Sequence, residues 1–240
     1  MKKMLYSVRV AELFEPGHTR AWPWLSKMTY PWDILADLPA IIREIGEGLD
    51  PAVYERVATD VWIARSATVA STVHIGGPAI IGEGSEVRHG AFIRASALVG
   101  DLCVVGNSTE LKNVILSDGV QVPHYNYVGD SILGYRAHMG AGAITSNVKS
   151  DKTPVTVRTI AAPPVGADPV GEYPIFVEAG RTKLGAVLGD RVEIGCNSVL
   201  NPGCVVGAGT TVYPLSSVRG VLPADAIYKS RQGAEIVPRV

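Results

Sequence analysis

Residues 67–100, "ATVASTVHIGGPAIIGEGSEVRHGAFIRASALVG", place an aliphatic side chain at every sixth position. The same spacing extends on both sides of this stretch. The full aliphatic series is Val57, Ile63, Val69, Ile75, Ile81, Val87, Ile93, Val99, Val105 and Leu111. A second, mostly small series follows each of these residues by four positions: Val61, Ala67, Val73, Ala79, Ser85, Ala91, Ala97, Cys103, Thr109 and Ile115. Internal repetition of this kind decides the fold class.

A period of six is neither the 3.6 residues of a helix nor the simple alternation of a hairpin strand. It predicts short strands joined by tight turns into a triangular coil of about 18 residues, with successive coils stacked at the spacing of β-strands. The aliphatic residue of each hexad points inward, and the small residue leaves room for the coil above. An ordinary β-sandwich does not keep ten consecutive hexads in phase.

The period resumes beyond residue 111 and is interrupted once. The later positions are Leu116, Val122, Val128, Leu133, Met139 and Thr145, and then Leu188, Ile194, Leu200, Val206, Val212 and Val218. The interruption predicts a loop ejected from the coil at about residues 151–187, and its ends, "PVTVRTI" and "YPIFVEA", are candidates to pair as a hairpin. We therefore expect a coil over residues 53–222 and a tail over 223–240.

Residues 1–52 precede the repeat and predict a short helical or irregular segment. In "YPWDILADLPAIIREIGEGLDP", Asp33 or Asp37 is a candidate N-cap, Pro39 suits a first turn, and Gly46 and Gly48 end the helix. The tryptophans of this segment are expected to anchor it against the coil rather than to bind an aromatic ligand.

The bulk composition indicates an ordered cytoplasmic protein. Hydrophobic residues make up 47% of the 240 residues, and the net charge is -1 with no basic run, so neither nucleic acid nor an anionic membrane is the expected partner. No signal peptide or stretch of about 18 apolar residues is recognised. The three cysteines show no CxxC spacing, which fits a reducing compartment without disulfides.

Polar residues gather where the period contracts to five, at Leu111 to Leu116 and at Val128 to Leu133. The contraction places Tyr127 beside Glu110, and Ala141 beside His124, on adjacent coils. Arg94 and Lys112, 18 residues apart, are expected to stack in unbroken register. Two stacked cations attract an anion, for which phosphate is the natural candidate, although two solvated surface cations remain the alternative.

The segment "ELKNVILSDGVQVPHYNYVGDSILGYRAHMGAGAITSNV" carries a specific resemblance. The repeat as a whole resembles the hexapeptide-repeat acyltransferases, which fold as a left-handed parallel β-helix. With its H-x-x-Y-x-G-D, G-A-G and T-x-N motifs, the segment is similar to the acetyltransferase half of the bifunctional glucosamine-1-phosphate acetyltransferase/UDP-N-acetylglucosamine pyrophosphorylases. It is also similar to the hexapeptide tails of related sugar-1-phosphate nucleotidyltransferases. The resemblance covers roughly residues 55–150 and 183–231. The left hand comes from this resemblance, since the general rule for parallel crossovers predicts the opposite.

The resemblance implies acetyl-CoA as co-substrate and assigns a role to matching residues. His124 corresponds to the catalytic base, and Glu110 is a candidate to hold its tautomer. The implied substrate-binding residues are Arg94, Lys112, Tyr127, His138, Asn147 and Lys183. The implied acetyl-CoA contacts are Ala141, Cys196 and Arg231. A homotrimer is the assembly expected from the resemblance, and nucleotide-sugar metabolism is the expected context.

Several features depart from that pattern. His138 replaces an asparagine that contacts the sugar, so the acceptor is open; Cys196 replaces a serine; and the ejected loop is much longer. No Gly-rich nucleotidyltransferase segment is present, so pyrophosphorylase activity is not expected.

The chemistry required is the removal of a proton from an amine before it attacks a thioester. A neutral imidazole, whose ordinary pKa is about 6.5, suits that task. A backbone amide of the "MGAGA" turn is a candidate to stabilise the oxyanion. Two other functions are weighed: a zinc hydratase of the γ-carbonic anhydrase kind, which the histidine spacing disfavours, and a non-catalytic module that binds a sugar nucleotide or a partner protein.

Overall fold

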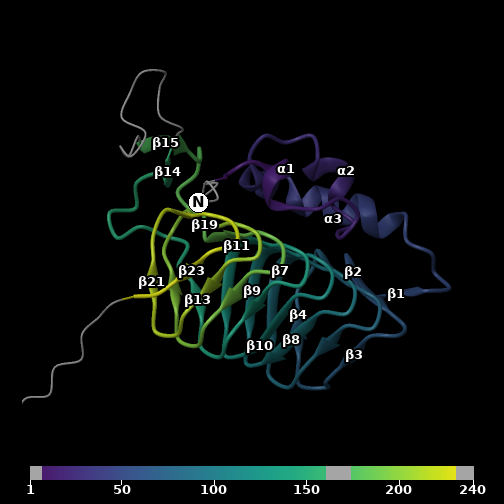
Figure 1. Ribbon diagram of the computed structural model, residues 1–240. Coiled ribbons are helices and arrows are strands. Elements are labelled where there is room, and N and C mark those ends of the chain that lie inside the picture. The colour runs from purple at the N-terminus through teal and green to yellow at the C-terminus, as the bar shows by residue number, and fades with distance from the viewer. Residues whose placement is uncertain (1–6, 161–173, 231–240) are drawn as a thin grey trace, which may run out of the picture.

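The computed structural model describes residues 7–160 and 174–230, and it shows a left-handed parallel β-helix with a helical segment along one side (Figure 1). The predicted fold class is therefore confirmed. Parallel strands stack in register from coil to coil and form three faces of a prism. Among the described residues, no helix has the length and apolar character needed to cross a membrane.

Each face of the prism is a ladder of short parallel strands. The first face holds β2 (Val61–Ala64), β5 (Ala79–Ile81), β16 (Ala186–Leu188), β19 (Cys204–Val206) and β22 (Val221–Leu222). The second holds β4 (His74–Ile75), β13 (Ile144–Thr145), β18 (Val199–Leu200) and β21 (Ser217–Val218). The third holds β3 (Thr68–Val69), β6 (Glu86–Val87), β8 (Val104–Asn107), β10 (Gln121–His124), β12 (His138–Met139), β17 (Glu193–Ile194), β20 (Thr211–Val212) and β23 (Ile227–Tyr228).

Three longer strands run from the second face onto the first without a break: β7 (Phe92–Val99), β9 (Glu110–Leu116) and β11 (Tyr127–Leu133). The predicted contraction lies in this region, and the expected pairing of Tyr127 with Glu110 is confirmed. The unbroken register expected for Arg94 and Lys112 is wrong. Lys112 pairs with Ala95, because the register between β7 and β9 shifts after Ile93.

The same shift corrects one assignment of the inward series. Val114 lies in the interior cluster of the coil, whereas Ile115 belongs to the cluster on its outer side. A strand that loses one residue exchanges its inward and outward faces, which explains the difference. The later inward positions, from Leu116 to Val218, are buried in the interior as expected.

The stacked coils come so close at Gly106 that no side chain fits there. A Cβ at this position would lie 1.6 Å from the carbonyl oxygen of Pro123 on the next coil. Backbone atoms of a packed coil cannot move away as the end of a flexible side chain can.

We expect Gly106→Ala to lower the free energy of unfolding by more than about 3 kcal/mol, measured by urea denaturation, because the added methyl forces two coils apart. Gly48→Ala is the matched control, since its nearest neighbour would lie 3.5 Å away. An equal effect of the two substitutions would contradict the close approach.

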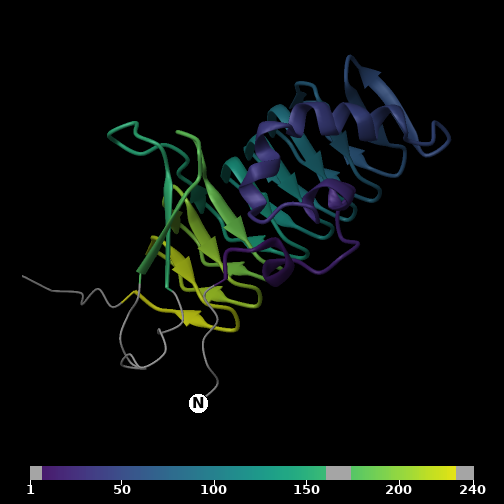
Figure 2. The ribbon, with the colours of Figure 1, turned by 90° about the horizontal axis from the view of Figure 1, so that it is seen from above.

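The N-terminal segment covers the first face (Figures 1 and 2). It contains α1 (Val10–Leu13), α2 (Trp22–Leu25), the 3-10 helix η1 (Pro31–Ala36) and α3 (Leu38–Glu47). Its apolar residues pack on an outward row of the coil made of Ile80, Leu98, Ile115, Ile132, Val187 and Val205. Trp32 is almost fully buried in this cluster, as expected of an anchor. Burying each such large side chain contributes about 1.5–3 kcal/mol.

The cap of α3 agrees only in part with the prediction. Asp37 occupies the N-cap position, Pro39 the first turn and Gly48 the C-cap position. The Asp37 side chain, however, makes no capping hydrogen bond.

The ends of the coil differ from the predicted boundaries. Val57 is exposed on β1 (Tyr54–Ala58), which pairs antiparallel with β2, so the first hexad does not belong to the coil. At the other end, β23 pairs in parallel with β20, and the coil therefore extends to Tyr228 rather than 222.

The ejected loop leaves the coil after β13 and returns at β16. Both ends therefore lie slightly earlier in the chain than the predicted bounds of about 151 and 187. Its two arms pair antiparallel as β14 (Thr156–Ile160) and β15 (Pro174–Glu178), which confirms the predicted hairpin. The arm that contains β14 packs on the first face of the coil, where Val155 and Val157 are buried in the same cluster as Val205 and Val221. A bridge between Val148 and Lys183 closes the base of the loop.

Candidate functional site

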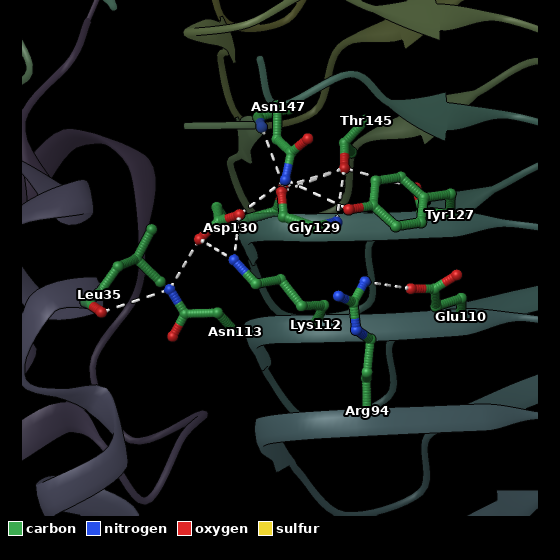
Figure 3. Close-up of polar contacts among 12 residues, drawn as sticks. Leu35, Arg94, Glu110, Lys112, Asn113, Tyr127, Gly129, Asp130, Thr145 and Asn147 are labelled. Carbon is green, nitrogen blue, oxygen red and sulfur yellow. Dashed lines mark hydrogen bonds and ion pairs between the residues drawn. The ribbon is translucent and has the colours of Figure 1, made fainter. Parts of the chain in front are cut away.

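A buried carboxylate organises the polar residues at the corner between the second and first faces (Figure 3). Asp130 is 2% exposed and has a left-handed backbone with φ of 47°. Its oxygens accept hydrogen bonds from Lys112 Nζ at 2.8 and 3.0 Å, from Asn113 Nδ2 at 2.9 Å and from Asn147 Nδ2 at 2.7 Å. One carboxylate thus fixes three side chains from β9 and from the segment after β13.

Tyr127 completes this network on the second face. Asn147 Nδ2 also donates to the Tyr127 hydroxyl at 3.2 Å. Burial raises the pKa of Tyr127, and the negative charges of Glu110 and Asp130 act in the same direction. The phenol therefore stays protonated and able to donate a hydrogen bond. Beneath it, Thr145 Oγ1 accepts the Gly129 N–H at 2.9 Å.

Arg94 lies beside the network but has a carboxylate of its own. Its Nη1 donates to Glu110 at 3.0 Å, and the pair is partly exposed. Arg94 and Lys112 are thus each balanced by a neighbouring acid, Glu110 and Asp130. The argument that these two cations need a phosphate to relieve their repulsion is corrected by this finding, because the chain supplies both anions.

His124 ends β10 on the third face, three residues before Tyr127. Its side chain is exposed, and its ring makes no hydrogen bond or ion pair with any residue that the structure describes. The backbone N–H and the backbone carbonyl of His124 are both hydrogen-bonded. The N–H donates to Asn126 Oδ1 at 3.1 Å, and the carbonyl accepts the Gly142 N–H at 3.0 Å. Glu110 accepts the hydrogen bond of Arg94, and no contact of the described residues joins it to the His124 ring, so its role in orienting that ring stays a prediction.

His138 and Cys196 lie together on the third face, away from the Asp130 network. Both line an open groove of about 330 Å³, with Gly140 and Tyr213. His138 Nδ1 contacts the Glu193 carboxylate at 2.8 Å, and the Cys196 side chain is exposed. Ala141 adjoins this groove, because its carbonyl accepts the Asn197 N–H at 2.8 Å. His138 is therefore close to the predicted acetyl-CoA residues rather than to Tyr127 and Asn147.

The two remaining predicted residues lie outside these groups. Lys183 is exposed at the base of the ejected loop, where it bridges the residue after Asn147. Arg231 lies outside the described residues.

Sequence reasoning missed Asp130 and Asn113 as members of the site. Asp130 was visible as the last residue of the Y-x-G-D motif, and its 18-residue separation from Lys112 was a usable signal. Asn113 carried no such signal. Its Nδ2 also lies 3.4 Å from the Leu35 carbonyl of η1, a contact between segments far apart in the chain (Figure 3).

The described residues contain no group of three or more His, Cys, Asp or Glu side chains arranged to hold a metal ion. The site is therefore built from hydrogen-bond donors, an imidazole and two ion pairs. Such a set can bind a polar ligand and accept a proton from it.

Comparison with known proteins places the repeat in context. No family model matches the chain. A bifunctional sugar-1-phosphate nucleotidylyltransferase/acetyltransferase of Sulfurisphaera tokodaii is 30% identical over 164 residues, 61% of this chain and 38% of that protein. The bifunctional protein GlmU of Methanococcus maripaludis strain S2 is 32% identical over 201 residues, 76% of this chain and 42% of that protein. The chain resembles the hexapeptide-repeat acyltransferases.

The likeness is partial in length. Matches to the relatives named GlmU in three Methanococcus species cover 26% to 46% of those proteins. Among solved structures, a hexapeptide transferase family protein from Anaplasma phagocytophilum is 16% identical, with a TM-score of 0.34 over 70% of this chain and 69% of that chain. A mutant GDP-perosamine N-acetyl transferase from Caulobacter crescentus, in complex with CoA and GDP-perosamine, is 21% identical, with a TM-score of 0.34 over 70% of this chain and 51% of that one.

Proposed function

We propose that this chain transfers the acetyl group of acetyl-CoA to the amine of an amino-sugar phosphate or related sugar nucleotide, with His124 as the general base. The observation that carries the proposal is the exposed imidazole of His124, which contacts no described side chain and lies three residues before Tyr127. The network of Tyr127 with Asn147, Asp130 and Lys112 presents hydrogen-bonding groups beside it. The similarity to bifunctional proteins with acetyltransferase in their names supports it.

The reaction is direct acyl transfer. His124 takes a proton from the acceptor amine, the amine nitrogen forms a bond to the thioester carbonyl carbon, and the C–S bond breaks to release CoA, whose sulfur takes up a proton. A base in this role contributes about 10²–10⁴ in rate. Lys112, Tyr127 and Asn147 orient the sugar, and Lys183 lies at its edge. Arg94 reaches the acceptor with Glu110 as its partner.

The acetyl-CoA site in this proposal is the groove on the third face that contains Cys196 and adjoins Ala141. Arg231 is assigned to the same site by the resemblance. His138, which lines the groove, then lies between the cofactor and the acceptor. In the same proposal the chain acts as a homotrimer in cytoplasmic nucleotide-sugar metabolism.

The test is the release of CoA from acetyl-CoA in the presence of glucosamine, its 1-phosphate and its nucleotide conjugates. Release with one of these amines, together with a mass increase of one acetyl group on that amine, is the expected result. No release with any amine would reject the proposal.

A non-catalytic module that binds a sugar nucleotide is the second candidate. One observation favours it: Glu110 is engaged by Arg94, so the described residues provide no carboxylate to orient the His124 ring. Tight binding of an amino-sugar nucleotide without any CoA release would support this alternative.

The groove assignment predicts a thiol-labelling result. Burial raises the pKa of Cys103 and of Cys204 to about 12, so both stay protonated and unreactive at pH 8, whereas Cys196 is exposed. Iodoacetamide should modify one cysteine in the folded protein and three in denaturant, counted by mass spectrometry. Saturating acetyl-CoA should slow Cys196 modification about tenfold, and ADP at the same concentration is the control. Unchanged labelling of Cys196 would place acetyl-CoA elsewhere.

A further inference from the structure

Arg181 is a half-buried cation without an acidic partner among the residues that the structure describes. It lies between β15 and β16, where the ejected loop returns to the coil. Its Nη1 donates to the Trp32 carbonyl at 2.9 Å, which is the only hydrogen bond of its side chain to a described residue. Its Nε is shielded from solvent and has no partner, and no described carboxylate lies within ion-pair distance.

This arrangement costs stability in the free protein. A buried donor without an acceptor costs about 1–3 kcal/mol, and a guanidinium charge removed from water is favourable only when an anion compensates it. Burial lowers the pKa of Arg181, while the charges of Asp130 and Asp33 act in the opposite direction from beyond contact distance. Both carboxylates are thus close enough to affect the pKa of Arg181, but neither forms an ion pair with its guanidinium.

The charges around the Asp130 network distinguish Arg181 from the other cations. Arg94 is paired with Glu110 at 3.0 Å, and Lys112 with Asp130 at 2.8 Å, so these four groups sum to zero. Arg181 adds one positive charge that no ion pair with a described residue neutralises, while the Asp33 carboxylate opposes it only from beyond contact distance. An incoming phosphate therefore gains more from Arg181 than from either paired cation.

The position of Arg181 joins three parts of the chain at the site. Its hydrogen bond reaches η1, which also borders the network through the Leu35 carbonyl beside Asn113. The residues just after it return to the network, since Leu184 N–H donates to Asn147 and Gly185 N–H to Asp130. Trp32 Nε1 is a second buried donor without a partner, on the residue that Arg181 contacts. Both donors are shielded from solvent, so they mark uncompensated polarity at this junction rather than the atoms that a ligand touches.

We propose that Arg181 binds the phosphate group of the acceptor, as a phosphate monoester or the diphosphate of a sugar nucleotide. The inference rests on the proposed function for the identity of the acceptor, and it deepens that function by assigning the anion to the ejected loop. Arg94 and Lys112 then contact the sugar while they stay paired with Glu110 and Asp130. The Nη2 atom of Arg181 makes no hydrogen bond to a described residue, and in this proposal it faces the phosphate.

The experiment measures binding of glucosamine and of glucosamine 1-phosphate by calorimetry to the wild-type chain, Arg181→Met, Arg181→Lys and Arg158→Met. Arg158 is an exposed arginine on β14 of the same loop and serves as the matched control. We expect Arg181→Met to weaken glucosamine 1-phosphate binding at least tenfold and to leave glucosamine binding within twofold. Arg181→Lys should be intermediate, and Arg158→Met should match the wild type.

Thermal unfolding provides the readout that separates binding from structure. Removing an unpaired, half-buried charge should leave the Tm of Arg181→Met unchanged or raise it, whereas loss of a structural arginine would lower it. The inference is overturned if Arg181→Met binds the phosphorylated sugar as well as the wild type does. It is also overturned if both sugars lose affinity equally, or if the wild type shows no preference for the phosphate. If Arg181→Met does not fold, the Lys variant carries the same comparison.

Turnover keeps this inference distinct from the proposed function. A wild-type chain that prefers glucosamine 1-phosphate, loses that preference in Arg181→Met and releases no CoA would retain the phosphate site and reject the acetyl transfer. If the wild-type chain releases CoA and Arg181→Met keeps the preference for glucosamine 1-phosphate, acetyl transfer is retained and the phosphate site at Arg181 is rejected.

Discussion

Replacement of His124 by alanine is expected to lower kcat for CoA release by two to four orders of magnitude, because the acceptor amine loses the base that takes its proton. The KM values for acetyl-CoA and for the acceptor should change by less than about threefold, since the ring makes no contact that holds the described site together. Stability should stay near that of the wild type, because the side chain is exposed.

His89→Ala is the matched control for this substitution. His89 is also exposed, in the turn after β6, where its Nδ1 contacts Thr72 Oγ1 at 2.7 Å; it lies two coils from His124, with Asn107 on the coil between them. It should retain wild-type turnover. The base would have to be sought elsewhere if His124→Ala kept more than about a tenth of the activity, or if His89→Ala lost as much as His124→Ala did.

Asp130→Ala should reduce both the stability and the binding of the acceptor. Removing the carboxylate leaves the Lys112 ammonium with one quarter of its side chain exposed and no counter-ion, and frees the amides of Asn113 and Asn147. Breaking one side of a buried ion pair costs several kcal/mol, and the partial exposure of Lys112 reduces this, so the free energy of unfolding should fall by about 2–4 kcal/mol. Urea denaturation measures it.

A double-mutant cycle with Lys112→Met separates the ion pair from the amide contacts. The double variant should be more stable than Asp130→Ala alone, because it no longer buries an uncompensated charge. Equal stability of the two variants would show that the Lys112 charge is not what Asp130 stabilises. In the cycle, KM for the acceptor should rise in both variants, while KM for acetyl-CoA stays near the wild-type value.

The sequence by itself determined the coil, the interruption and most of the residues at the corner. A six-residue period of aliphatic side chains has one structural solution, because only a stacked three-sided coil buries every sixth residue. The contraction of the period to five residues was also visible in the sequence, and it predicted the pairing of Tyr127 with Glu110. The hairpin of the ejected loop followed from its two strand-like arms.

Tertiary structure alone decided which charges are paired. Whether Arg94 and Lys112 face a ligand or an acid depends on where the register shifts within the contracted step, after Ile93, and on the left-handed turn at Asp130; the repeat shows the contraction but not its position within the strand. The side-chain network depends on distances of about 3 Å, whereas the repeat specifies only which residues share a face.

The sequence also could not predict which segments outside the coil pack against the site. Trp32 and Arg181 are 149 residues apart and meet only because η1 lies along the first face while the ejected loop returns beside it. Local periodicity reports which side of a strand is buried, because burial repeats with the backbone. It carries no information about which distant segment covers that side, because that choice is made by packing between segments rather than within one.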